Sequence, residues 1–178
     1  MFNKFAMAAR AAVLTAAREA QAGAAPAVTD EHLLLALLAT PHTRSAGLLE
    51  SAGITTTMVD AAFRSAERKG GLSDSEAESL LRELGIDVDQ VVATVEESLG
   101  EGALTERQRP RSGRVPFAGT AKTILRGALD EAKSQNEKEL RDEHLLLAIA
   151  AHDGVAGQLL STHGLSYLDL RTQLATAS

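Results

Sequence analysis

Cysteine and tryptophan are both absent from this chain of 178 residues, and aromatic side chains make up only 3% of it. The lack of cysteine excludes disulfides, thiolate metal sites and thiol nucleophiles, and it is compatible with the cytoplasmic location that we expect. Because large aromatics are scarce, leucine, alanine, valine and isoleucine must build the core, which favours thin, closely packed helices.

Positive charge is also scarce, since the formal net charge is -6. Proteins that neutralise nucleic-acid phosphates need a clustered excess of lysine and arginine, so nucleic acid is not an expected partner. No apolar run approaches the roughly 20 residues that a bilayer-spanning helix needs, so no membrane partner is expected either. The beginning of the chain has the composition of a signal peptide, but its apolar residues recur at three- and four-residue steps. That period predicts a folded amphipathic helix with one apolar face, formed by Phe2, Phe5, Ala9, Val13, Ala16 and Ala20.

An internal duplication is the most informative feature of the sequence. The heptad DEHLLLA occurs at residues 30–36 and again at 142–148, and the same shift of 112 positions pairs Phe5 with Phe117. The match continues with a one-residue slip into the following segment, so each unit has about 60 residues, comparable to a pair of helical hairpins. We therefore predict an all-α fold of two four-helix repeats related by a pseudo-twofold axis.

The domain organisation follows from this duplication, with repeat 1 at residues 1–71 and repeat 2 at residues 117–178. Between them, LLRELGIDVDQVV has the spacing of LLESAGITTTMVD in repeat 1, which predicts an inserted helical hairpin at residues 72–100. Residues 101–116 contain glycine and proline without an apolar period, so we interpret them as a linker within one compact domain. Four arginines of the linker indicate a solvated tether, with a phosphate or acidic-partner site as the alternative: Arg107, Arg109, Arg111 and Arg114.

Helix ends can be placed at the same positions of both repeats. Gly53 and Gly164 follow a Leu-Leu pair, and glycine most easily takes the left-handed conformation after a helix. Thr55 and Ser166 come two residues later and are good N-cap residues. We predict that the third helix of each repeat ends at the glycine and that the fourth begins after the hydroxyl residue.

The duplicated Glu-His pairs are the candidate metal or catalytic groups. Adjacent helix residues point about 100 degrees apart, so neither Glu31 with His32 nor Glu143 with His144 can hold one ion alone. We interpret both histidines as partly buried residues bonded to the backbone, and a small helical metalloenzyme is the remote alternative. The sequence contains no nucleophile elbow or phosphate-binding loop, so we expect no catalytic residue, metal or cofactor.

The two glutamates keep a second interpretation. On equivalent helices they present matched carboxylates, each able to accept a guanidinium or ammonium group. The alternative is that Glu31 and Glu143 only interact favourably with the helix dipole.

Three stretches and their second copies carry a resemblance to a known family: MFNKFAMAARAAVLTAAREA, DEHLLLALL and LLESAGI. They resemble the double-repeat N-terminal domain of Clp unfoldases of the ClpA and ClpC type, and above all the stand-alone Clp N-domain proteins of actinobacteria. The resemblance implies a domain that binds adaptors, substrates or degradation tags and catalyses nothing. It implies phosphoarginine binding by Glu31 and Glu143, although Ala6 and Ala118 stand where the family usually has threonine.

A second ligand surface is implied by the same resemblance, namely one for cyclic-peptide antibiotics of the cyclomarin type. Arg114 and Arg126 differ from the family's usual histidine and glutamate there. We therefore expect a non-enzymatic accessory protein of a Clp protease system, whose partners are cyclic peptides or degradation tags and a Clp ATPase or adaptor. A structural adaptor that docks on the Clp ATPase ring is the alternative. The residues that match the antibiotic surface are Phe2, Val13, Phe117 and Lys122.

Overall fold

The computed structural model describes residues 5–70 and 115–176. The predicted hairpin at 72–100 lies outside the described residues, as does the predicted linker up to residue 114, so their boundaries stay predictions. The chain divides into two compact units, and both copies of the duplicated heptad belong to the first. The first unit consists of Met1–Phe63 and Val115–Ser178, and the second of Arg64–Arg114.

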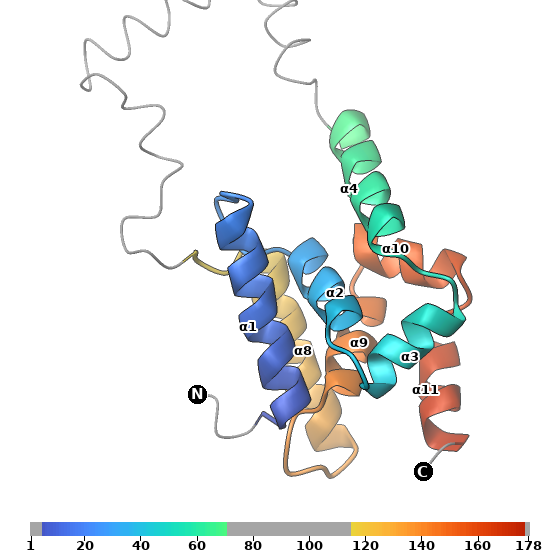
Figure 1. The fold of residues 1–178 in the computed structure, drawn as a ribbon. Helices are drawn as coiled ribbons and strands as arrows, with labels where there is room; N and C mark the ends of the chain where they lie inside the picture. Colours follow the sequence, from blue (N-terminus) through green and yellow to red (C-terminus); the bar gives the residue numbers. More distant parts are fainter. Residues whose placement is uncertain (1–4, 71–114, 177–178) are drawn as a thin grey trace, which may run out of the picture. The chain divides into compact units, whose positions relative to one another are not determined.

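The described residues form helices and two isolated backbone bridges, without a strand among them (Figure 1). This confirms the predicted all-α fold with four helices in each repeat. The helices of repeat 1 are α1 (Met7–Ala22), α2 (Asp30–Ala39), α3 (Arg44–Ser51) and α4 (Thr56–Gly70). Those of repeat 2 are α8 (Gly119–Ser134), α9 (Asp142–Ala151), α10 (Val155–Thr162) and α11 (Tyr167–Thr176).

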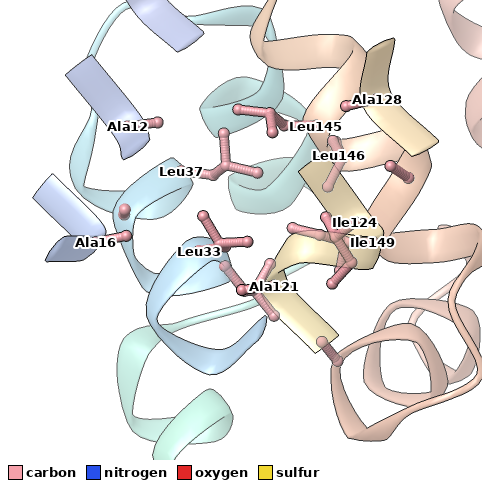
Figure 2. Close-up of a cluster of buried hydrophobic side chains, with 14 of the residues drawn as sticks. Ala12, Ala16, Leu33, Leu37, Ala121, Ile124, Ala128, Leu145, Leu146 and Ile149 are labelled. Carbon is pink, nitrogen blue, oxygen red and sulfur yellow. The ribbon is translucent and has the colours of Figure 1, made fainter. Parts of the chain in front are cut away.

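The two heptad helices, α2 and α9, form the centre of the first unit. Both are apolar on nearly every side, and a helix of that kind is stable only when protein surrounds it. Helix α1 packs on α2, α8 packs on α9, and α2 and α9 contact each other. In Figure 2, leucines and Ile149 of the central helices meet small side chains of α1 and α8, which let the helices approach closely: Ala12, Ala16, Ala121 and Ala128.

The apolar face predicted for the first helix is confirmed where the structure describes it. Ala9, Val13, Ala16 and Ala20 are all buried in the core. Phe5 lies just before α1 and packs against the core from outside the helix. Phe2 lies outside the described residues.

The helix ends predicted at the two glycines and the helix starts predicted after the two hydroxyl residues are confirmed. Gly53 has φ +72° and Gly164 has φ +75°, so each takes the left-handed conformation just after α3 or α10. The oxygen of Thr55 accepts from the backbone N–H of Met58 at 3.4 Å at the start of α4. At the start of α11, Ser166 and Asp169 each accept from the other's backbone N–H, a reciprocal capping box.

The repeats are joined by an exchange of backbone bonds. The N–H of Ala6, which precedes α1, donates to the carbonyl of Leu140 in repeat 2 at 2.9 Å. The N–H of Ala118, which precedes α8, donates to the carbonyl of Val28 in repeat 1 at 2.8 Å. Since Ala6 and Val28 are the duplicates of Ala118 and Leu140, the two bonds are equivalent under the pseudo-twofold. Each repeat therefore holds the first helix of the other at its N-terminus.

In the part of the chain that the structure describes, no single helix has both the length and the hydropathy of a membrane span. Helices α9 and α10 reach that level only when taken together, and they are bent by 97° at the break between them.

Two helical glycines allow a matched test of the packing between α9 and α10. A Cβ atom on Gly157 would lie 2.2 Å from the carbonyl oxygen of His152, whereas a Cβ on the exposed Gly47 would meet nothing within 4 Å. We expect Gly157→Ala to lower the free energy of unfolding by about 1–3 kcal/mol or more through overpacking. Gly47→Ala should raise it by roughly 0.5–1 kcal/mol, because alanine favours a helix interior. Urea unfolding of both variants checks this, and equal effects would contradict the packing described.

Candidate ligand-binding site

The polar residues of the heptads all lie in the first turns of α2 and α9. Each turn begins with an aspartate and a glutamate, followed by the histidine. Nδ1 of His32 accepts from the backbone N–H of Thr29 at 3.2 Å, and Nδ1 of His144 accepts from that of Arg141 at 3.0 Å. The structure thus shows both histidines bonded to the backbone, as interpreted from the sequence. Each closes the N-terminus of its own helix, in the place that glutamate or glutamine takes in a capping box.

This geometry requires an unprotonated Nδ1 in both rings, because an acceptor nitrogen carries no hydrogen. Burial lowers the pKa of His32, and the negative charges of Glu19 and Asp30 oppose that shift. Burial also lowers the pKa of His144, chiefly against the negative charges of Glu137 and Glu143. Both imidazoles are therefore neutral structural groups near neutral pH.

The aspartates of the heptads contact the opposite repeat. The carboxylate of Asp142 accepts from the backbone N–H of Ser45, in the first turn of α3, at 3.0 Å. On the equivalent side, the carboxylate of Asp30 lies 3.5 Å from the position a Cβ on Gly154 would take, just before α10. Both aspartates are buried with 7% of their surface exposed. Each thus lies at the positive end of a helix dipole that belongs to the other repeat.

The glutamates lie at the outer side of these turns. Glu143 keeps 14% of its side chain exposed, and one of its carboxylate oxygens lies 3.5 Å from Nη1 of Arg44 in repeat 1. Glu31 occupies the same position in α2 and is partly buried. Glu143 thus interacts with repeat 1 through its side chain, as Asp142 does.

The residues of the predicted antibiotic surface are only partly brought together. Phe117 is half-buried just before α8, and Lys122 is exposed in the first turns of that helix. Val13 is buried at 2% exposure in the core, so in this conformation it supports α1 from beneath and offers no surface to a ligand. Phe2 lies outside the described residues, and the role of the set stays a prediction.

The two alanines that replace the family's threonines are the residues preceding α1 and α8. Neither helix has a side-chain cap at that position. The backbone N–H groups of Ala6 and Ala118 are used in the bonds between the repeats. An anion bound at either helix end would therefore depend on the free N–H groups of the first turn, without help from a side chain at the capping position.

Among the described residues, no group of three or more histidine, aspartate or glutamate side chains could hold a metal ion. The remaining histidines lie at helix junctions. His152 and His163 are the C-cap residues of α9 and α10, and His42 lies between α2 and α3.

The sequence did not predict which residues of repeat 1 contact the polar residues of the second heptad. Arg44 and Ser45 lie 97 or more residues before the heptad residues that they contact. The only signal was a difference between the copies, because repeat 2 has Val155 and Ala156 at the equivalent positions. It also missed that Glu131 of α8 accepts from Tyr167 at 2.8 Å and pairs with Arg171 at 3.0 Å, which ties α11 to α8.

These features define a duplicated helical domain in which each repeat completes the other. The family model of the Clp repeat (R) N-terminal domain matches residues 69–163, more than half of the chain. The chain belongs to this family. The match begins before the predicted inserted hairpin and extends through most of repeat 2.

Similar proteins agree with this assignment. The chain is 30% identical over 103 residues to the chloroplastic ClpA homolog of Brassica napus, an ATP-binding subunit of the ATP-dependent Clp protease, and to the chloroplastic chaperone protein ClpC1 of Arabidopsis thaliana. Each match covers 55% of this chain but only 11% and 10% of these relatives, so the chain spans about a tenth of their length. The N-terminal domain of the chaperone ClpD from Arabidopsis thaliana has the same fold, with a TM-score of 0.56 at 21% identity over 98% of this chain and 97% of that one.

The capping role of the histidines predicts a pH-dependent stability. Because their pKa is lowered in the folded state, the unfolded chain binds more protons at mildly acid pH, and stability rises with pH there. The contribution should be complete above the ordinary histidine value of about 6.5 and should be lost as the pH falls below it. Urea unfolding at about pH 5.5 and 7.5 measures the difference.

Glutamine keeps an acceptor without the titration, so His32→Gln with His144→Gln should show a smaller difference between the two pH values. His163→Gln is the control, because this ring donates to the carbonyl of Leu159 and a protonated ring can do the same. An unchanged difference in the double variant would contradict the role of the two rings.

Proposed function

We propose that the protein is a non-enzymatic, cytoplasmic binding protein of a Clp protease system, and that its ligands are peptides or degradation tags. One observation carries the proposal: both heptads begin a central helix, so their glutamates lie at equivalent, partly buried positions at two helix N-termini, while the histidines cap the helices themselves. The relatives named above are Clp ATP-binding subunits and chaperones, and this chain corresponds to about a tenth of each. A module that receives ligands for such an ATPase, or docks on it, fits that relationship.

The hydrogen bonds of the histidines and of Asp142 argue against acid-base catalysis by the heptads. A general base needs a lone pair free to take a proton from substrate. Nδ1 of both histidines already accepts a backbone hydrogen bond, and the carboxylate of Asp142 accepts another. The polar groups best suited to proton transfer are thus held by the protein itself.

An arginine side chain is the ligand chemistry that the glutamates suit best. A guanidinium pairs with a carboxylate through parallel N–H bonds, and such charge-assisted bonds are about twice as strong as neutral ones. For phosphoarginine, the helix N-termini next to Ala6 and Ala118 would receive the phosphate through backbone N–H groups. Because neither alanine supplies a hydroxyl, we infer that recognition of such a tag rests mainly on its guanidinium half.

A peptide with one phosphoarginine tests this function. We expect Glu31→Gln with Glu143→Gln to weaken binding at least tenfold, which corresponds to about 1.4 kcal/mol, since hydrogen bonds to charged groups contribute about 1.5–3 kcal/mol. Glu50→Gln is the control, because Glu50 is exposed in α3. Calorimetry measures all three proteins, and equal affinity in the double variant and the control would exclude the two glutamates as the binding groups.

A second candidate function is the binding of cyclic-peptide antibiotics of the cyclomarin type, through Phe2, Phe117 and Lys122. The half-buried ring of Phe117 and the exposed ammonium group of Lys122 both belong to the N-terminal end of α8. An aromatic anchor beside a polar contact is a common arrangement in ligand sites. Val13 would contribute from the core beneath α1.

Titration with a cyclomarin-type peptide tests the second function. We expect Phe2→Ala with Lys122→Ala to weaken binding by at least about tenfold, because truncating an aromatic anchor typically costs 2 kcal/mol or more. Phe117→Leu should weaken binding further while keeping an apolar side chain against the core. Lys138→Ala is the control, since Lys138 is exposed elsewhere in repeat 2. Binding that is unaffected by these changes would exclude this surface.

A further inference from the structure

The duplicated heptads are identical, but the residues that each one meets in the other repeat are not. The heptad of repeat 2 meets the first turn of α3, where Thr43 is the N-cap and Arg44 and Ser45 follow. The equivalent first turn is that of α10, with Gly154 as the N-cap, then Val155 and Ala156. The polar sequence of α3 is thus replaced by a small, apolar one.

Arg44 is anchored at both ends of its guanidinium group. Nη1 lies 3.5 Å from Oε1 of Glu143, and Nη2 donates to the carbonyl oxygen of Leu174 in α11 at 3.0 Å. The arginine keeps 33% of its side chain exposed and the glutamate 14%, so the arginine is the more exposed member of the pair. Asp142, adjacent to Glu143, accepts from the backbone N–H of Ser45, which fixes this turn of α3 against α9.

We propose that Arg44 is an internal ligand of Glu143: its guanidinium occupies the place that the guanidinium of an arginine-containing peptide would take. Position 155, the counterpart of Arg44, is a valine, so the equivalent turn of repeat 2 cannot supply this pair. This inference rests on the proposed function and specifies its ligand, since it makes Arg44 the residue that decides how well the Glu143 carboxylate receives a second guanidinium.

Competition explains why one residue has this effect. A tethered group acts at an effective concentration on the order of millimolar, and an incoming guanidinium must displace it. The pair also lies partly out of water, where an ion pair is screened less than on the open surface. Removing Arg44 leaves the Glu143 carboxylate without this partner. An external guanidinium can then form the ion pair in place of Arg44.

Methylguanidinium is the probe for this proposal, because it carries the guanidinium without the rest of an arginine. The test variant is Arg44→Val, which copies the residue of the second repeat. In NMR titrations of the full chain, the signals of the first turn of α9 should shift with at least about tenfold higher affinity in Arg44→Val than in the wild type. Arg18→Val, at an exposed arginine of α1, should respond as the wild type does.

Arg44→Val with Glu143→Gln should lose the gained response. Should Arg44→Val not fold, Arg44→Lys takes its place, since lysine lacks the planar fork and competes less well for a carboxylate. Equal affinity in the wild type and the Arg44 variant, or a double variant that responds as the single one does, would overturn the assignment.

A phosphoarginine peptide then separates this inference from the function on which it rests. We expect the peptide to bind Arg44→Val more tightly than the wild type. If methylguanidinium gives the expected pattern but neither protein binds the peptide, the proposed function is wrong and the role of Arg44 stands. If the peptide binds both proteins equally through Glu31 and Glu143, the function stands and the role of Arg44 is wrong.

Discussion

The structure depends on an exchange between the two repeats. The N–H groups of Ala6 and Ala118 each donate to a carbonyl of the opposite repeat, just before the heptad helix there. The carboxylate of Asp142 in turn accepts from the first turn of a helix in repeat 1. Because buried backbone groups must be paired, neither repeat completes its hydrogen bonding alone. The exchange brings α2 and α9 into contact at the centre, and their leucines form the shared core.

This exchange also determines what the heptad can do for function. Its leucines are buried, its histidine closes its own helix, and its aspartate lies at a helix end of the other repeat. The glutamate also lies at the N-terminal end of a central helix. The carboxylate of this glutamate is the group that we propose to bind a ligand.

Much of this was predictable from the sequence. The identical heptads, the paired Gly53 and Gly164 and the apolar period of the first helix are local signals, and each led to the observed element. The histidines were predictable as backbone-bonded because they follow a helix start by a fixed spacing. The contacts of Asp142 and Arg44 were not, because they join positions about 100 residues apart and depend on how the repeats dock. The apolar period marked Val13 as buried, whereas the family resemblance marked it as a ligand contact, and the structure places it in the core.

Identical motifs need not give identical sites when the second half of each site comes from elsewhere. The heptads kept the same sequence, but the turns that face them, at α3 and α10, have diverged. In α3 the divergence carries a local cost, since Oγ of Ser45 is buried and has no hydrogen-bond partner among the described residues. An unpaired buried hydroxyl destabilises a fold by about 1–3 kcal/mol. Alanine at position 156 avoids that cost in repeat 2, so the polar turn of α3 is not the more stable solution for packing. Its neighbour Arg44, by contrast, has a side chain that reaches across the repeats to both Glu143 and the carbonyl of Leu174.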